Sequence, residues 1–462
     1  MSEETPLLLD ATKLSPYLRF SPSRKRLIVV IVSCGGLLTP FVVRCFIPSI
    51  PKVAEEFHSS AAIVNLAVSL PILAAAIGCS VWATYSCFYG RRPIYLGSLG
   101  TLCLGCLGVI LSRTIPQLVV FRILQVFGAS SGISVGTGII ADIYALEERG
   151  TAMGIFYTAF VLGPTLAPFA GGIATHYFTW RLLQFGLMVF SFLWCVVAFF
   201  LLPETSHVGS RGMDQIVGED LARKTVKLVW LNPLKSLWLL RSPNVMAVTL
   251  AGSFAVLTDF VLLSPIAYTI GKRYNITNEA LIGALCIPAG IGNMIGSSMS
   301  GRLSDSVVIR WRNKRGGKWV PEDRLRAALF GAGILVPFSV LLCGFVTRFI
   351  ADAPGIALSL TCTFMNGIGV YFVMAPTAVY GTDVLHSRSA EVAAANLLVR
   401  GVVLAIAVSC VLPLIEAFGV FWTNFLAAIF AWFGFALLYI TIKYGDRMRA
   451  YVNVGFTTNP DA

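Results

Sequence analysis

Twelve apolar runs, each about 20 residues long, constrain this chain more than any other feature. A helix of that length crosses the hydrocarbon core of a bilayer while satisfying its own backbone hydrogen bonds. The runs are continuous and do not alternate at period two, which argues against a β-barrel. The sequence therefore predicts an all-α polytopic membrane protein, with spans near residues 27–47, 62–84, 93–111, 118–141, 150–174, 181–202, 244–270, 280–300, 327–347, 356–380, 392–415 and 420–442.

The composition agrees with a membrane protein. Only 13% of the residues are charged and 56% are hydrophobic, whereas a soluble domain carries about 25% charged residues. The 11 cysteines and four histidines show no metal-ligand spacing, and no nucleophile has a candidate base beside it in a motif. We therefore expect no metal, no cofactor and no enzyme activity.

The spans divide into six plus six around a long polar interruption. This pattern predicts a tail at 1–26, a bundle at 27–202, a linker at 203–243, a second bundle at 244–442 and a tail at 443–462. Internal repeats of this kind are typical of secondary transporters. The first tail contains Glu3, Leu7 and Leu8 in the spacing of an acidic dileucine sorting signal, a pattern that also arises by chance.

The distribution of basic residues predicts the orientation. With a cytoplasmic N-terminus, 26 of the 35 Lys and Arg residues fall in cytoplasmic segments and six in outside loops. The positive-inside rule then places both termini in the cytoplasm. It also explains the net charge of +12 without nucleic acid as a partner. Asn275, in Asn275-Ile-Thr277, lies outside in this topology and is a possible glycosylation site.

The loop between spans 2 and 3 reads ATYSCFYGRRPIYLG over residues 83–97. It resembles the signature loop of the major facilitator superfamily, Gly-x-x-x-Asp-Arg-x-Gly-Arg-Arg-Pro. The matching residues are Gly90, Arg91, Arg92 and Pro93, and the departures are Ala83, Cys87 and Phe88. In that family the charged loop helps to latch the outward-facing state, so Cys87 implies that the acidic half of the first latch is missing. The second half keeps its acid in Gly301-Arg302-Leu303-Ser304-Asp305. The alternative is that residues 90–92 only form a tight basic turn.

Further motifs resemble the fungal twelve-spanner drug:proton antiporters of the same family, over about residues 27–445. They are Arg122-x-x-Gln125-x-x-Gly128 in span 4, Gly163-Pro164, Pro168 and Gly171-Gly172 in span 5, Trp180-Arg181, Leu202-Pro203-Glu204-Thr205, Arg388-Ser-Ala-Glu391, and Asn396-Leu-Leu-Val-Arg400 in span 11. The resemblance implies two six-helix bundles and alternating access. Gly163, Pro164 and Pro168 would make span 5 bent and closely packed near the interface of the bundles, a role that packing alone also explains.

Two charges lie deep in the first span of each bundle, Arg44 and Asp259. A central Arg costs at least about 2.5–3.5 kcal/mol on insertion scales unless it is paired or wet. Counting from the outer loops gives both residues a similar depth, so we expect them to flank the substrate site and to couple. Asp259 would be a protonation site that Arg44 keeps ionised until substrate competes. Alternatively, Arg44 binds an anionic group of the substrate, or the two form a purely structural ion pair.

Other polar residues inside spans are weaker candidates. Arg122 is either a proton-coupling residue or a donor to backbone carbonyls, since spans 1, 2 and 5 contain no acid to pair with it. Gln125, Asn293 and Asn396 either line the site or form hydrogen bonds between helices for about 0.6 kcal/mol each. Arg400 belongs to the same candidate set. An aromatic wall would come from Tyr157, Phe160, Tyr268, Tyr371 and Phe372.

These observations predict a monomeric, proton-driven exporter of a small organic compound, such as a secondary metabolite, an organic acid or a drug. Arg44 favours an anionic substrate. The first alternative is a symporter or facilitator that imports a nutrient, which the span-5 motif disfavours. A non-transporting receptor on the same fold is the second. The cell membrane is the expected location, with the vacuolar membrane as an alternative.

Overall fold

The computed structural model describes residues 19–144, 146–206, 211–214, 231–317, 320–385 and 389–451. Within these residues the chain forms helices, and 12 of its helical spans are long and apolar enough to cross a membrane. Each predicted apolar run overlaps one of these spans, so the all-α polytopic class is confirmed. The dileucine pattern, Arg388 and much of the predicted linker lie outside the described residues. The bounds of the predicted tails and linker stay predictions.

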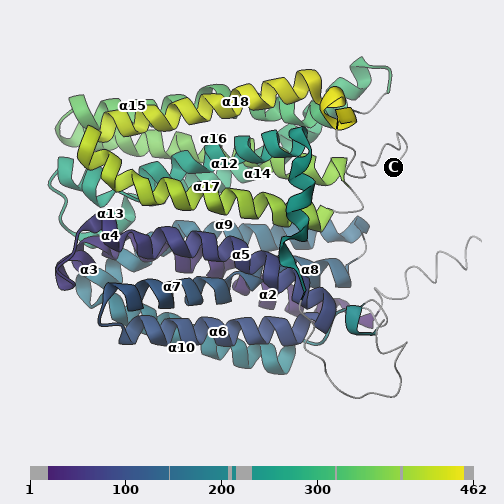
Figure 1. Cartoon of the computed structure of the whole chain (residues 1–462), viewed down its shortest axis with the longest axis horizontal. Coiled ribbons are helices and arrows are strands. Elements are labelled where there is room, and N and C mark those ends of the chain that lie inside the picture. Colours follow the sequence, from purple (N-terminus) through teal and green to yellow (C-terminus); the bar gives the residue numbers. More distant parts are fainter. Residues whose placement is uncertain are drawn as a thin grey trace, which may run out of the picture.

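The first six spans form one bundle, drawn in purple to blue in Figure 1. Its elements are α2 (Pro22–Arg44), η2 (Ile47–Ser49), α3 (Ile50–Glu56), α4 (Ala61–Val64), α5 (Leu66–Tyr89), α6 (Arg91–Leu111), α7 (Ile115–Ala129), α8 (Ser131–Ile143), α9 (Leu146–Tyr177) and α10 (Trp180–Leu201). Spans 1, 2 and 4 are each interrupted, so that two or more helices share one crossing.

The last six spans form the second bundle, drawn in teal through green to yellow in Figure 1. Its elements are η3 (Pro233–Arg241), α12 (Pro243–Leu263), η4 (Ala267–Gly271), α13 (Glu279–Ala284), α14 (Ile287–Lys314), η5 (Pro321–Ala328), η6 (Gly331–Leu335), α15 (Val336–Phe349), α16 (Asp352–Val384), α17 (Ser389–Phe418) and α18 (Val420–Tyr451). The η4 and η6 segments are short π-helices within spans 7 and 9.

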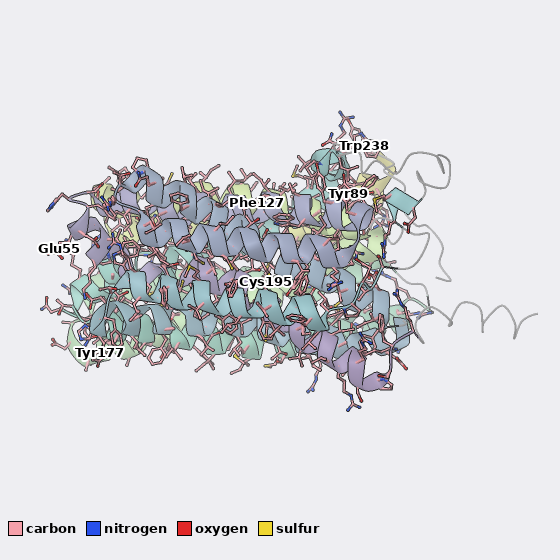
Figure 2. The ribbon with its side chains drawn as sticks, turned by 90° about the horizontal axis from the view of Figure 1, so that it is seen from below. Glu55, Tyr89, Phe127, Tyr177, Cys195 and Trp238 are labelled. Atoms are coloured by element: carbon pink, nitrogen blue, oxygen red, sulfur yellow. The ribbon has the colours of Figure 1, made fainter. Side chains whose placement is uncertain are left out.

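Figure 2 distinguishes the two ends of the molecule. Tyr89 and Trp238 lie at one end, and Glu55 and Tyr177 lie at the other. We call these the Tyr89 end and the Tyr177 end. The predicted topology would place the Tyr89 end in the cytoplasm, and this orientation stays a prediction.

Prolines shape two of the helices that carry the site. Pro71 lies inside α5 and has no backbone N–H, so the carbonyl of Ala67, four residues earlier, has no helical partner. Span 1 breaks after Arg44, and Pro48 follows in η2. The last carbonyls of α2 therefore also need donors from outside the helix. These unpaired carbonyls lie where a buried cation can use them.

The two bundles touch most closely where glycines remove the side chains. A Cβ added at Gly172 of α9 would lie 2.2 Å from the carbonyl oxygen of Glu279, and one added at Gly283 of α13 would lie 2.3 Å from that of Pro168. Both separations are far below a normal carbon–oxygen contact, so α9 and α13 can pack this closely only with glycine at these positions. The α5 and α17 helices pack beside each other at the same interface (Figure 1).

Candidate functional site

Arg44 and Asp259 form an ion pair that joins the two bundles. Arg44 ends α2, and Asp259 lies in the interior of α12. Nη2 of Arg44 donates a 2.5 Å hydrogen bond to Oδ2 of Asp259, and the two side chains are 10% and 4% exposed. The guanidinium also lies 4.6 Å from the ring centre of Phe260. The expected proximity of the two charges is confirmed, and their role in transport stays a prediction.

Tyr371 lies near this pair and near a second arginine of the spans, Arg400. Tyr371 on α16 interacts electrostatically with Arg44, with Asp259 and with Arg400 of α17. We call Arg44, Asp259, Tyr371 and Arg400 the central cluster. It draws one residue from the first bundle and three from the second, so a change in its charge acts directly on the contact between the bundles.

Arg122 is held mainly by backbone carbonyls, and it is fully buried. Its Nε donates to the carbonyl of Ala67 at 3.2 Å, its Nη1 to that of Val42 at 3.0 Å, and its Nη2 to that of Val43 at 3.4 Å. These are the carbonyl that Pro71 leaves unpaired and carbonyls of the last turn of α2. The geometry favours the second of the two roles expected for Arg122, that of a donor to backbone carbonyls.

Gln125 extends this arrangement within the first bundle. Its Oε1 accepts from Arg122 Nη1 at 2.8 Å. Its Nε2 donates to Oε1 of Gln184 at 2.8 Å and to Sγ of Cys106 at 3.0 Å. Because its amide already bonds to three side chains of its own bundle, Gln125 acts here as a bridge between helices.

The two candidate asparagines lie in contacts among helices of the second bundle. Asn396 Oδ1 accepts a hydrogen bond from the hydroxyl of Thr249 on α12. Asn293 on α14 packs against Gly367 of α16, where an added Cβ would lie 3.0 Å from its Oδ1. That oxygen is buried without a hydrogen-bond partner among the described residues. Neither asparagine contacts the Arg44–Asp259 pair through a hydrogen bond.

The glycine-proline segment of span 5 lies within one continuous helix, α9. A Cβ added at Gly163 would lie 2.7 Å from the carbonyl of Leu37 and 2.9 Å from Cγ of Pro40, so this glycine allows α9 to approach α2. Pro168, about one turn after Pro164, faces α13 with its carbonyl. The segment therefore packs on both bundles, and its part in gating stays a prediction.

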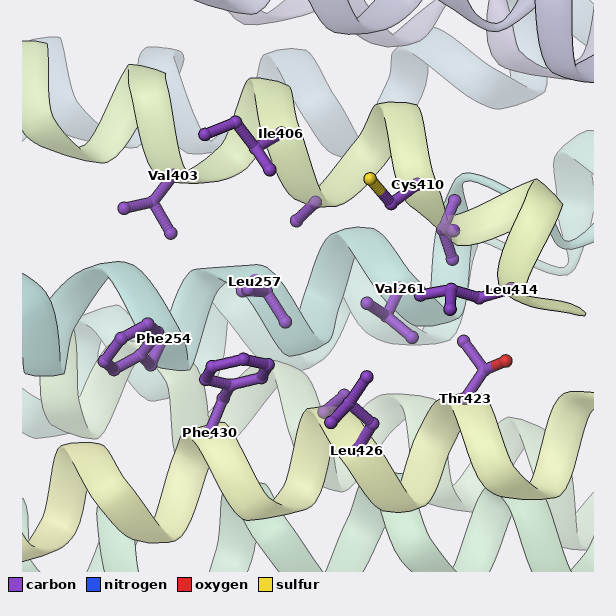
Figure 3. Close-up of a pocket in the computed structure, with 13 residues that line it drawn as sticks. Phe254, Leu257, Val261, Val403, Ile406, Cys410, Leu414, Thr423, Leu426 and Phe430 are labelled. Atoms are coloured by element: carbon purple, nitrogen blue, oxygen red, sulfur yellow. The ribbon is translucent and has the colours of Figure 1, made fainter. Parts of the chain in front are cut away.

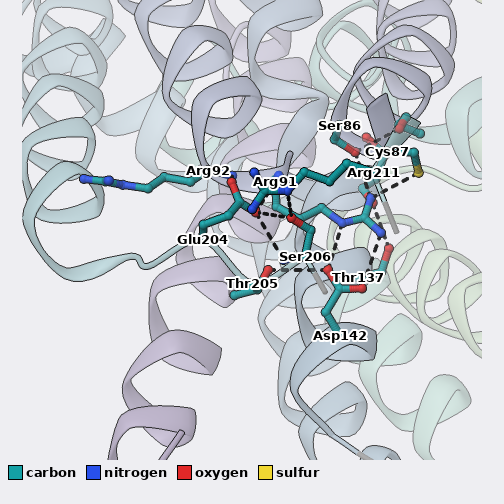
Figure 4. A network of polar contacts seen from close by, with 12 residues as sticks. Ser86, Cys87, Arg91, Arg92, Thr137, Asp142, Glu204, Thr205, Ser206 and Arg211 are labelled. Atoms are coloured by element: carbon teal, nitrogen blue, oxygen red, sulfur yellow. Dashed lines mark hydrogen bonds and ion pairs between the residues drawn. The ribbon is translucent and has the colours of Figure 1, made fainter. Parts of the chain in front are cut away.

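The loop between spans 2 and 3 forms a compact polar network at the Tyr89 end (Figure 4). Nε of Arg91 donates to Oδ2 of Asp142 at 2.9 Å, and its Nη1 donates to Oγ of Ser86 at 2.8 Å and to Sγ of Cys87 at 3.4 Å. Cys87 itself supplies no acid, as the sequence predicts, but Arg91 still has a carboxylate partner, and the effect on the latch stays a prediction. Asp142, from the end of span 4, supplies the carboxylate.

Glu204 caps the start of α6 in the same network. Its two carboxylate oxygens accept from the backbone N–H groups of Arg91 at 2.9 Å and Arg92 at 3.2 Å. Gly90 has φ +108°, and an added Cβ would lie 2.6 Å from this carboxylate. Burial raises the pKa of Glu204, but the hydrogen bonds from Ser206, Arg91 and Arg92 outweigh burial and lower it below its ordinary value. We call Arg91, Asp142, Cys87 and Glu204 the first loop cluster.

The second bundle has a corresponding group. Arg324 in η5 donates from Nε to Oδ2 of Asp383 at 2.7 Å and from Nη1 to Oδ1 of Asp305 at 3.0 Å. Asp383 lies near the end of α16, as Asp142 lies near the end of α8. We call Arg324, Asp383 and Asp305 the second loop cluster.

Charged and polar side chains also join the bundles at the Tyr177 end. Lys52 Nζ lies 3.4 Å from Oε1 of Glu279, and Nδ1 of His176 lies 2.9 Å from Oε2 of Glu279. Asn278 Nδ2 lies 3.2 Å from Nε2 of His176. Together with the Gly172 and Gly283 contacts, these bonds hold the bundles together at this end. Asn275 is exposed here, as a glycan acceptor must be.

The two best-formed cavities lie on the sides of the bundles and away from the central cluster. One, of about 290 Å³, is enclosed by α12, α17 and α18 and includes Leu257 and Val261 (Figure 3). Each of these residues is two positions from Asp259, and two positions rotate a helix by about 200°. The other cavity, of about 610 Å³, lies between α6 and α10. Both are almost entirely apolar, which suits contact with lipid chains.

Sequence reasoning missed the two partners that organise the loop clusters, Asp142 and Asp383. Each is an acid placed at the end of the fourth span of its bundle. That shared position was a usable signal, because repeated halves place corresponding residues in corresponding contacts. Glu204 was noted only as the end of span 6, and its backbone partners gave no side-chain signal.

The chain is similar in sequence to known membrane transporters. A family model described as Major Facilitator Superfamily matches residues 32–409. MFS-type transporter phiD of a Fungal sp. is 26% identical over 472 residues, covering 95% of this chain and 71% of that protein. Efflux pump radE of Floropilus chiversii is 26% identical over 440 residues, covering 92% and 80%. MFS antiporter QDR3 of Candida albicans is 24% identical over 520 residues, covering 86% and 74%.

Among solved structures, the crystal structure of the human organic anion transporter MFSD10 (TETRAN) is similar in fold. It has a TM-score of 0.57 and 18% sequence identity, and the match covers 91% of this chain and 100% of that chain. At this level of identity the likeness supports the architecture of the two bundles and carries no statement about substrate.

Proposed function

The chain belongs to the major facilitator superfamily, and on that premise we propose that it exports a small organic compound in exchange for protons, with Asp259 as the proton site. Membership makes the chain an integral multi-pass membrane transporter and not an enzyme. The names of similar proteins, an efflux pump and an antiporter, support export and exchange. We further propose that it acts as a monomer, driven by the proton gradient without a cofactor, in the cell membrane or alternatively the vacuolar membrane.

One observation carries the proton site, the buried ion pair between Arg44 and Asp259. Protonation of Asp259 removes one charge and leaves Arg44 buried without a counter-ion. Breaking a buried pair in this way costs about 3–5 kcal/mol. Since the pair joins the two bundles, that cost applies to the arrangement seen here and favours one in which the bundles have moved apart at this level.

Exchange also requires that proton and substrate do not travel together. The ionised pair offers a substrate both a donor and a negatively charged acceptor, and protonation removes that charge and turns one carboxylate oxygen into a donor. A substrate that donates a hydrogen bond to Asp259 is therefore released when the proton binds. The proton-loaded protein can then return without substrate, which is the antiport cycle.

A second function, co-transport of an anion with a proton, is favoured by the charge of the central cluster. The cluster contains two arginines and one aspartate, so its net charge is positive while Asp259 is ionised. An anion bound beside it favours protonation of Asp259, because it offsets the added positive charge. If this electrostatic linkage outweighs direct competition, proton and substrate move in the same direction.

Transport in proteoliposomes tests both functions. Purified full-length protein is reconstituted with a pH-sensitive dye inside, and fluorescein, rhodamine 6G and 2-naphthoate are supplied as an anionic, a cationic and a small aromatic probe. Proton flux opposite to probe flux supports exchange, and flux in the same direction supports co-transport. Probe transport that is indifferent to an imposed pH gradient would rule out both.

The variant Asp259→Asn tests the proton site directly. We expect it to lose gradient-driven transport while keeping slow downhill exchange of the probe. The matched control is Asp352→Asn, which removes a carboxylate from an exposed residue with φ +58°, where asparagine is well tolerated. Full gradient-driven transport by Asp259→Asn would contradict the assignment.

A further inference from the structure

Arg400 differs from Arg44 and Arg122, the two buried arginines of the spans, because it has no hydrogen-bond partner among the described residues. Its Nε atom is buried without a hydrogen bond, and the guanidinium forms no hydrogen bond or ion pair with any of the described residues. Arg122 uses three backbone carbonyls and Gln125, and Arg44 uses Asp259. The residue as a whole is only partly buried, so its terminal nitrogens are open to a partner that arrives from outside the chain.

The groups around Arg400 converge on a small space above Gly252 of α12. A Cβ added at Gly252 would lie 3.2 Å from Oγ1 of Thr377, 3.8 Å from Sδ of Met374 and 3.9 Å from Nη2 of Arg400. Thr377 and Met374 are on α16 and Arg400 is on α17, so three helices face this space. The missing side chain of Gly252 leaves room beside a cation, a hydroxyl group and a sulfur atom.

The net charge around Arg400 determines the charge of the ligand that fits there. Arg44 and Asp259 neutralise each other, which leaves Arg400 as one net positive charge in the central cluster. A monoanion neutralises that charge, whereas a dianion would leave an excess negative charge in a membrane-spanning region. The planar guanidinium matches the two oxygens of a carboxylate. Of the two arginines in the central cluster, Arg400 is therefore the candidate anion receptor, because Arg44 already has a carboxylate partner.

We propose that Arg400 binds the carboxylate of an organic monoanion, with Gly252 providing the space and with Tyr371 near both Arg400 and Asp259. The proposal rests on the proposed transport function and names the class of its substrate. The rest of such a substrate extends toward Met374, which provides an adaptable apolar contact.

Binding measured without transport tests the subsite. Purified full-length protein in lipid nanodiscs is titrated with benzoate, 2-naphthoate and their uncharged amides at constant pH, and affinity is read by calorimetry and by thermal shift. We expect the wild type to prefer each carboxylate to its amide. Arg400→Gln should lower the affinity for 2-naphthoate by about tenfold or more, and Arg400→Lys should recover part of the loss because it keeps the charge.

Two further variants separate binding from folding. Arg400→Gln removes an unpaired, partly buried charge, so its melting temperature without ligand should rise, whereas loss of a structural arginine would lower it. Gly252→Ala fills the space but keeps the charge, and it should weaken carboxylate binding without removing Arg400. Arg273→Gln, which removes an exposed cation at the Tyr177 end, is the control and should bind as the wild type does.

The outcomes are distinct from those of the transport assay. Equal affinity of the wild type for the carboxylates and their amides would overturn the subsite, as would unchanged 2-naphthoate binding in Arg400→Gln. Proton-coupled transport could then still be intact. Conversely, carboxylate-selective binding that depends on Arg400, in a protein whose transport ignores the pH gradient, would support the subsite and remove the proposed proton coupling.

Discussion

The first and second loop clusters share an arginine–aspartate pair at corresponding places and differ in the third residue that contacts the arginine. Each centres on an arginine bound to an aspartate at the end of a fourth span, Arg91 with Asp142 and Arg324 with Asp383. The third position differs. Cys87 contacts Arg91 through sulfur at 3.4 Å, whereas Asp305 binds Arg324 through a carboxylate at 3.0 Å.

The exposed fractions of the paired side chains indicate how much each carboxylate contributes to stability. Arg91 and Asp142 are 16% and 14% exposed, and Arg324 and Asp383 are 16% and 15% exposed. Asp305 is 69% exposed. An exposed ion pair contributes about 0–1 kcal/mol, far less than a partly buried one. The chain has therefore lost the weaker acid from the first cluster and kept the stronger one, so that the first cluster depends on a single carboxylate while the second has two.

Asp142→Asn should produce the largest effect, because it leaves Arg91 partly buried without a counter-ion. We expect a loss of about 2–3 kcal/mol, somewhat below the range of about 3–5 kcal/mol for fully buried pairs, since both side chains keep some contact with water. Thermal melting of the full-length protein in nanodiscs measures it. Asp383→Asn is the matched variant and should cost less than half as much, because Arg324 keeps Asp305. Equal losses would mean that the second carboxylate provides no reserve.

Glu204→Gln should produce the next largest effect, about 1–2 kcal/mol, because an uncharged amide is a poorer cap for the first N–H groups of α6. Since the folded pKa is lowered, the contribution of Glu204 is present above the ordinary carboxyl range and is lost as the pH falls through the folded value. Melting temperature measured from pH 7 down to pH 4 and below should therefore fall more steeply for the wild type than for Glu204→Gln.

The exposed Glu148, in the turn between spans 4 and 5, provides the control for that experiment. Glu148→Gln should preserve the pH dependence of the wild type. A Glu204→Gln variant with the full acid sensitivity of the wild type would show that another carboxylate is responsible, and the cap would then contribute little at neutral pH.

The fold was predictable because apolar length is a local property that the spans carry individually. The proximity of Arg44 and Asp259 was also predictable, since both lie at similar depth in the first span of each repeated half. The partners of Arg122 were not. They are carbonyls left unpaired by Pro71 and by the end of α2, and backbone groups carry no signature of residue type.

The sequence likewise could not predict that Arg400 has no hydrogen-bond partner among the described residues. A missing partner becomes visible only when the surroundings of the side chain are known on all sides. The same limit applies to Cys87. Comparison with the family pattern identified the lost acid, but Asp142 lies 55 positions later and its contact with Arg91 depends on how the helices pack.

Cys87→Asp should convert the first cluster into a copy of the second. An added exposed carboxylate beside Arg91 should stabilise the protein by about 0.5 kcal/mol at low salt. The clearer effect is the interaction between positions 87 and 142. In the Cys87→Asp background, Asp142→Asn should lower the free energy of unfolding by less than it does in the wild type. A double-mutant cycle of melting temperatures measures this. Cys87→Ser is the control, because it changes the side chain without adding charge. Additive effects of the two substitutions would show that a carboxylate at position 87 does not reach Arg91.

Asp305→Cys makes the reverse conversion and should have the smallest effect by itself, about 0.2–0.5 kcal/mol, because an exposed pair is weak. Raising the salt concentration to about 1 M, where the Debye length is about 3 Å, should remove most of it. The informative measurement combines Asp305→Cys with Asp383→Asn. In the Asp305→Cys background, Asp383→Asn should lower the free energy of unfolding as much as Asp142→Asn lowers it in the wild type. Should Asp383→Asn remain mild in that background, a different group must compensate Arg324, and the difference between the two clusters would not come from the residue that aligns with Cys87.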